Sequence, residues 1–80
     1  MKYAYTKYYK LENTINTPRL WEEIWAEKDN TYYVLQVKNL ETKQVKKMHY
    51  IITPDYQWIY KDRIKHLKPI SKQEAFIELL

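Results

Sequence analysis

The chain has 80 residues, of which 14 are Lys or Arg and 10 are Asp or Glu, so its net charge is +4. It contains neither glycine nor cysteine. The absence of glycine excludes phosphate-cradling loops and dinucleotide folds, and the absence of cysteine excludes disulfides and thiolate metal sites. A chain of this length is expected to form a single domain, residues 1–80, around a small core.

The N-terminal half predicts a strand followed by a helix. Residues 2–12 alternate tyrosines with other side chains in the way that a strand does. Thr17 and Pro18 are a helix-start signal, because threonine caps well and proline suits the first helical position. Four apolar residues then follow at helical spacing: Leu20, Trp21, Ile24 and Trp25. This helix is expected to end at Asn30, a residue that tolerates the left-handed conformation.

The middle of the chain predicts a hairpin and a third strand. Residues 31–38 and 45–53 are rich in β-formers, and the short segment between them suits an antiparallel hairpin. Without glycine, two-residue turns of the Asn-Gly kind are not expected, and longer turns should take their place. Residues 56–61 carry aromatic side chains at alternate positions, which predicts a strand with Trp58 in the core.

The C-terminal end predicts helical structure. Residues 62–67 suit one helical turn, with Ile64 and Leu67 facing inward, and Ser71 with Glu74 forms a capping box for a final helix. The predicted fold is α+β, in the order β-α-β-β-β-α. It has a small antiparallel sheet of three to four strands, a helix in the N-terminal half and a short C-terminal helix. One sheet face should carry the helices, and the other should be wetter. An SH3-like β barrel with appended helices is the alternative.

No catalytic set is visible in the sequence. His49 and His66 lie 17 positions apart, and neither has a second ligand at metal spacing. Ser71 is explained by helix capping. We therefore expect no catalytic residue, no metal site, no cofactor and no enzymatic activity.

The excess of tyrosine favours protein binding. Nine tyrosines are more than so small a core can hold, since each buried hydroxyl needs a hydrogen-bond partner. Adjacent tyrosines in a strand point to opposite faces, so one of each pair should lie outside the helix-covered face. The interface candidates are Tyr8, Tyr9, Tyr32, Tyr33, Tyr56 and Tyr60. A homodimer through an edge strand, for example residues 2–12, is a further arrangement that the sequence allows.

The second half of the chain is mildly basic. Seven cations from residue 43 to residue 68 are opposed by Asp55 and Asp62. They are the candidates for contact with nucleic acid or an acidic partner: Lys43, Lys46, Lys47, Lys61, Arg63, Lys65 and Lys68. Basic side chains near aromatic rings are typical of single-strand binding surfaces. Codon usage in an AT-rich genome would also enrich lysine and tyrosine without selection for binding.

The composition gives the functional prediction. A tiny chain without glycine and rich in Lys and Tyr resembles small accessory proteins of phages and mobile elements in AT-rich bacteria. Many of those bind and block a host enzyme or a defence complex. We therefore predict a cytoplasmic, non-enzymatic binding or inhibitory protein that occupies a partner protein, one that handles nucleic acid or belongs to a defence complex. Direct nucleic-acid binding is the alternative. No signal peptide or membrane span is visible.

Overall fold

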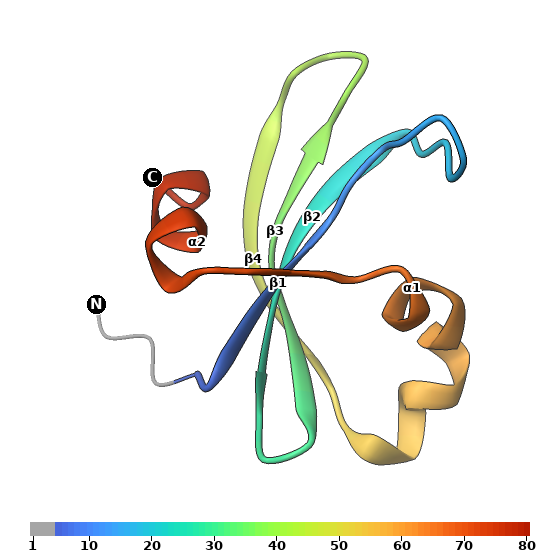
Figure 1. The fold of residues 1–80 in the computed structure, drawn as a ribbon, viewed down its shortest axis with the longest axis vertical. Coiled ribbons are helices and arrows are strands. Elements are labelled where there is room, and N and C mark those ends of the chain that lie inside the picture. Colours follow the sequence, from blue (N-terminus) through green and yellow to red (C-terminus); the bar gives the residue numbers. More distant parts are fainter. Residues whose placement is uncertain (1–4) are drawn as a thin grey trace.

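The chain forms one five-stranded antiparallel sheet with short helices from its C-terminal half on either side (Figure 1). The computed structural model describes residues 5–80. The strand order across the sheet is β4-β3-β2-β1-β5. The elements in chain order are β1 (Lys7–Leu11), β2 (Trp21–Lys28), β3 (Thr31–Asn39), β4 (Val45–Ile52), the 3-10 helix η1 (Pro54–Tyr60), α1 (Lys61–Lys65), β5 (Lys68–Ile70) and α2 (Lys72–Glu78).

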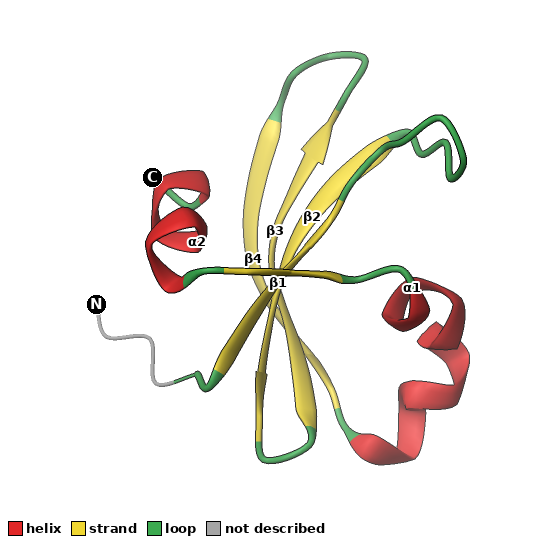
Figure 2. Cartoon of the chain, in the orientation of Figure 1, coloured by secondary structure: helices red, strands yellow, loops and turns green. Residues whose placement is uncertain are grey.

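The helix predicted in the N-terminal half is wrong, because that segment is the central strand β2 (Figure 2). β2 pairs with β1 on one side and β3 on the other. Ile24 and Ala26 point to one face of the sheet, and Glu23 and Trp25 point to the other. Burial on both faces produces a run of apolar side chains whose spacing also fits a helix.

A two-residue turn joins β2 to β3, contrary to the expectation of longer turns only. Asp29 and Asn30 both have positive φ, at 52° and 61°, and Lys28 pairs with Thr31 across the turn. Positive φ at both central residues is typical of a type I′ turn, and Asp and Asn tolerate it better than most residues. Asn30 is therefore left-handed as predicted, but it closes a hairpin and does not end a helix.

The predicted hairpin of β3 and β4 is confirmed, whereas the predicted third strand is wrong. Residues 54–60 form η1, which begins with Pro54 in a position where no amide donor is required. In this conformation the three aromatics do not share a strand face. Trp58, predicted to lie in the core, is 73 % exposed.

The predicted C-terminal helical segments are confirmed, but the prediction of three to four strands is wrong, because residues 68–70 form a fifth strand, β5, that pairs with β1. α1 supplies the expected turn, and Ile64 and Leu67 pack inward. The Ser71 side-chain oxygen accepts a hydrogen bond of 3.0 Å from the backbone N–H of Glu74, which caps α2.

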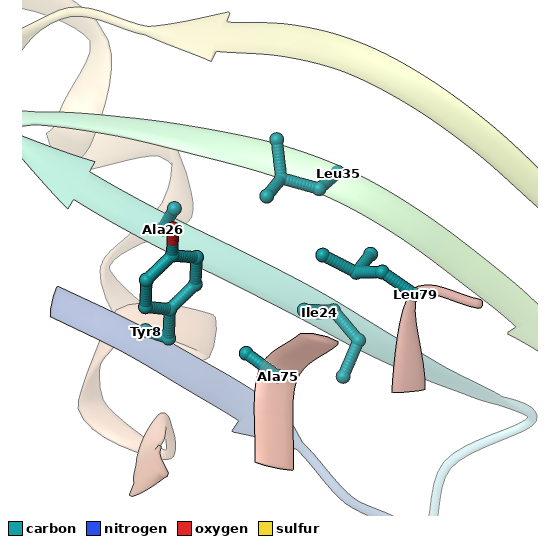
Figure 3. Packing of buried hydrophobic residues seen from close by; sticks show 6 residues of the cluster. All are labelled: Tyr8, Ile24, Ala26, Leu35, Ala75 and Leu79. Atoms are coloured by element: carbon teal, nitrogen blue, oxygen red, sulfur yellow. The ribbon is translucent and has the colours of Figure 1, made fainter. Parts of the chain in front are cut away.

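Two cores flank the sheet, so the expectation of one wet face is also wrong. On one face α2 packs Ala75 and Leu79 against the sheet (Figure 3). The sheet residues of this first core are Tyr8, Ile24, Ala26 and Leu35. On the opposite face the second core is Trp25, Val34 and Ile52, which Tyr60, Ile64 and Leu67 cover from η1, α1 and the residues after it. Figure 1 shows α2 and α1 on opposite sides of the strands.

The sheet is open. β4 and β5 are its two edges, and no ladder in residues 5–80 joins them into the closed barrel of the alternative prediction. β1 lies between β2 and β5, so Lys7–Leu11 offers no free edge for a dimer, contrary to the expectation for residues 2–12. Residues 2–4 of that predicted strand lie outside the described residues.

Candidate binding face on the η1 side of the sheet

A ridge of large apolar side chains runs along the end of β4 and η1. Its five members are all exposed, and we call them the η1 ridge: Tyr50, Ile51, Tyr56, Trp58 and Ile59. Four of them, all except Trp58, line one hollow of about 370 Å³ at the edge of the sheet. Tyr50 and Ile51 are neighbours in the edge strand β4 and point to opposite faces of it. None of the five belongs to either buried core, and each is at least half exposed.

Local contacts fix the direction in which η1 presents these side chains. Gln57 donates a hydrogen bond of 2.5 Å from Nε2 to the backbone carbonyl of Asn30, in the β2–β3 turn. The backbone N–H of Tyr56 donates to the carbonyl of Thr53. The inward Gln57 leaves its neighbours Tyr56 and Trp58 directed to solvent. The 3-10 conformation of η1, which the Gln57–Asn30 hydrogen bond holds in place, therefore keeps Trp58 exposed.

A groove of about 350 Å³ lies beside the ridge, between the sheet and α1. We call it the Glu23 groove. Its lining comes from four consecutive parts of the fold, namely β2, β3, β4 and the η1–α1 segment. The lining residues are Trp21, Glu23, Val34, Val37, Met48, Tyr50, Tyr60 and Arg63. This volume is near the lower limit for ligand pockets, about 300 Å³, and suits a single side chain of a partner.

Glu23 is a nearly buried carboxylate within this apolar lining. It is 8 % exposed, and its Oε1 accepts a hydrogen bond of 2.9 Å from Nε1 of Trp25. In residues 5–80 no Lys, Arg or His nitrogen lies within ion-pair distance of it. A buried charge is ordinarily paired with an opposite charge, so this carboxylate is only partly satisfied inside the protein.

Tyr50 and Tyr60 join the groove to the ridge, since both line both hollows. Their hydroxyls share a hydrogen bond of 2.7 Å, and their rings meet edge to face at 6.1 Å. This hydrogen bond raises the pKa of the Tyr60 hydroxyl above its ordinary value. The Arg63 guanidinium lies 5.8 Å from the centre of the Tyr60 ring, in the range of a cation–π contact.

The six predicted interface tyrosines fall into two groups. Tyr56 and Tyr60 lie on the binding face described above. The paired tyrosines point to opposite faces as predicted, with Tyr8 and Tyr33 on the α2 side and Tyr9 and Tyr32 on the η1 side. These four are buried or half-buried, and Tyr8 is 4 % exposed. The Tyr9 hydroxyl donates a hydrogen bond of 2.6 Å to Glu27 Oε1.

The seven predicted basic residues do not form one surface. Lys43, Lys46 and Lys47 belong to the β3–β4 hairpin, and its turn lies far from α1 in Figure 1. Lys47 donates a hydrogen bond to the backbone carbonyl of Leu79, at the end of α2. Lys61, Arg63 and Lys65 are exposed together on α1. Lys68 is in β5, where its Nζ is 3.7 Å from a carboxylate oxygen of Glu12.

The histidines do not suggest a metal site. His49 stacks on Tyr33 at 5.4 Å, and its Nε2 is 3.2 Å from the Tyr5 hydroxyl. Nδ1 of His66 is 2.9 Å from the backbone carbonyl of Asp62, and both residues are in the α1 segment. Within residues 5–80 no three metal-ligating side chains of the His, Cys, Asp and Glu type gather in one place. Across the same residues no helix has the length and apolar character needed to cross a membrane.

Of the groove residues, the sequence predicts Tyr60 and Arg63 as candidates but does not single out the others. The sequence pattern places Trp21 and Glu23 in a helix, and Met48 and Tyr50 within the strand predicted at residues 45–53. The alternation Trp21-Glu23-Trp25 and Met48-Tyr50-Ile52 was the available signal, because each triplet places its members on one strand face. No protein-family model matches the chain, and neither a curated protein nor a solved structure is significantly similar to it.

Proposed function

We propose that the chain is a non-enzymatic binding protein that occupies the surface of a partner protein and blocks it. The η1 ridge and the Glu23 groove form the contact face. The observation that carries this proposal is the ridge itself, five large apolar side chains exposed at the end of β4 and in η1, on a chain of 80 residues. Contiguous apolar surface rimmed by polar residues is typical of protein interaction sites.

The chemistry of the ridge supports a protein partner. Moving one large apolar side chain from water into an apolar contact contributes about 1.5–3 kcal/mol of favourable free energy. The exposed side chains of the ridge could therefore contribute to binding when a partner covers them. Trp and Tyr are enriched among the residues that dominate interface energetics. Trp58 is the most exposed tryptophan of the chain, and Tyr56 lies two positions before it. We therefore infer that Trp58 is the central anchor of the interface.

The class of partner follows from composition alone. The resemblance to phage and mobile-element accessory proteins favours a host protein that handles nucleic acid or takes part in defence. The exposed cations Lys61, Arg63 and Lys65 border the ridge and would suit an acidic patch beside the partner's apolar pocket.

Direct nucleic-acid binding remains the second candidate, and one observation favours it. Trp58 and Tyr56 are free to stack on bases, and the same continuous segment carries the α1 cations. If these cations neutralise phosphates, affinity for single-stranded DNA must fall steeply with salt, with a log–log slope of about −0.7 per contact. The absence of measurable binding at low salt would eliminate this candidate.

Affinity capture followed by reconstitution tests the proposed function. The tagged full chain is used to capture a partner from nuclease-treated bacterial lysate, and the captured protein is purified and titrated calorimetrically. Trp58→Ala is expected to weaken the complex more than tenfold, as for an interface hot spot. Ile15→Ala is the matched control, because Ile15 is exposed in the β1–β2 loop and outside the ridge. A partner that binds wild type and Trp58→Ala equally, or capture that nuclease abolishes, would contradict the proposal.

A further inference from the structure

The Glu23 groove combines apolar walls with a nearly buried carboxylate. Its walls are formed by Val34, Val37 and Met48. Glu23 lies among them, and within residues 5–80 Trp25 supplies the only hydrogen bond to the Glu23 carboxylate. A carboxylate held in such surroundings attracts a cation more strongly than one in water does, because the local dielectric constant is lower.

Aromatic rings complete the lining. Trp21, Tyr50 and Tyr60 come from three different elements and line the same hollow as Glu23. The faces of such rings carry partial negative charge and attract ammonium or guanidinium groups. A ligand that satisfies both parts of the groove needs an apolar stem and a cationic head, and Lys and Arg side chains have this form.

We propose that the Glu23 groove binds one basic side chain, Lys or Arg, of the partner protein. The stem would lie along the apolar walls, and the head would reach Glu23 beside the aromatic rings. This inference rests on the proposed function, because it names the chemistry that the partner presents next to the ridge. Pairing would give Glu23 the opposite charge that it lacks within the described chain.

Two cations of the chain itself lie near the groove without filling this role. Arg63 lines the groove, but its guanidinium is directed at the Tyr60 ring. Lys46 lies two strands away from Glu23 on the same face of the sheet, because Val37 is the cross-strand partner of both residues. Neither forms an ion pair with Glu23 within 4 Å. They repel an incoming cation, so their removal should not weaken its binding.

The test uses three small probes that differ only in the head group. They are the N-acetyl methylamides of lysine, arginine and norleucine, titrated into the full-length protein and followed by the NMR signal of the Met48 methyl group. Glu23→Gln removes the charge but keeps a carbonyl acceptor for Trp25 Nε1. Glu41→Gln is the matched control, because Glu41 is exposed in the β3–β4 turn and does not line the groove. Thermal unfolding of each variant shows that it remains folded.

The proposal predicts that wild type binds the lysine or arginine probe about tenfold more tightly than norleucine. Glu23→Gln should abolish this preference, and Glu41→Gln should preserve it. Equal binding of norleucine, an unchanged preference in Glu23→Gln, or no binding of any probe at millimolar concentration would overturn it. These results are separate from the proposed function, because a partner that depends on Trp58 could still dock through the ridge alone.

Discussion

The two faces of the sheet are covered in different ways. On the α2 face, a single short helix packs Ala75 and Leu79 against the sheet side chains of the first core (Figure 3). On the η1 face, the cover is an irregular 3-10 and α-helical segment that contributes Tyr60, Ile64 and Leu67. The η1–α1 segment does not extend over Trp21. The part of the face that remains uncovered is the Glu23 groove.

Under the proposed function, this difference assigns stability mainly to one face of the sheet and binding to the other. On the α2 face, Tyr8, Ile24 and Leu35 are buried beneath the helix. Polar contacts from the sheet hold the helix end in place: Gln36 Nε2 donates to the carbonyl of Glu78 at 2.9 Å, and Lys10 Nζ lies 2.8 Å from the Glu78 carboxylate. The η1 face buries Trp25 but exposes Trp58. We infer that the α2 face serves folding alone, and that the η1 face serves both folding and recognition.

The largest expected effect comes from comparing two tryptophans on the η1 face. Trp25→Ala should cost about 3–5 kcal/mol, because its side chain is fully buried. A domain of 80 residues has a total stability of roughly 4–12 kcal/mol, so this variant should be near unfolding. Trp58→Ala should change stability by less than about 0.5 kcal/mol. Urea denaturation measures both, and a large loss in Trp58→Ala would show that the ridge is part of the core.

A second comparison concerns how closely α2 fits the sheet. Ala75→Leu should destabilise by about 1–3 kcal/mol, because the added atoms have no space in the first core. Gln73→Leu places the same side chain on the exposed side of α2 and should be nearly neutral. Equal stability of the two variants in urea would contradict the close packing described for this face.

The cap of α2 should have a smaller effect. Ser71→Ala removes the acceptor for the Glu74 N–H and should cost about 1 kcal/mol. Ser71→Asp keeps an acceptor at this position and should retain most of the stability. Thermal unfolding distinguishes the two, and a loss that is the same in both would mean that the cap does not support the helix.

The smallest expected effect is a dependence of stability on alkaline pH. Burial and the hydrogen bond to Glu27 raise the pKa of Tyr9, and the hydrogen bond to Glu78 raises the pKa of Lys10. The folded chain therefore holds these protons more tightly than the unfolded chain does. Their stabilisation is complete below about pH 10 and declines as the pH rises through the raised values. Tyr9→Phe should flatten this decline in denaturation curves above pH 10, whereas Tyr56→Phe, on the exposed ridge, should not.

The sequence predicts the elements whose signals are local. The β3–β4 hairpin and the Ser71 cap were correct because alternation and capping chemistry act over a few residues. β2 was mistaken for a helix because a central strand buried on both faces loses its alternation, and Thr17-Pro18 resembled a helix start. η1 is predicted as a strand because its aromatics alternate, but Tyr56 and Trp58 are exposed and Tyr60 packs against the second core.

The candidate site was only partly accessible from the sequence. Tyr56 and Tyr60 were identified, since an excess of tyrosine indicates surface use. Glu23 and Trp21 were not identified, because the apolar spacing of residues 20–25 also fits a helix and hides their alternation. The groove itself forms only where β2 and the residues after β4 meet in space. The separation of the hairpin lysines from α1 likewise depends on the sheet order, which no local pattern specifies.

The most direct test of the account follows the indole N–H signals of the three tryptophans by NMR during titration with the lysine probe. Trp21 lines the groove, Trp25 donates its indole N–H to Glu23, and Trp58 lies on the ridge. The account predicts that the Trp21 and Trp25 signals move together with a single dissociation constant, while the Trp58 signal stays fixed. Movement of Trp58 with no change at Trp21 and Trp25 would contradict it.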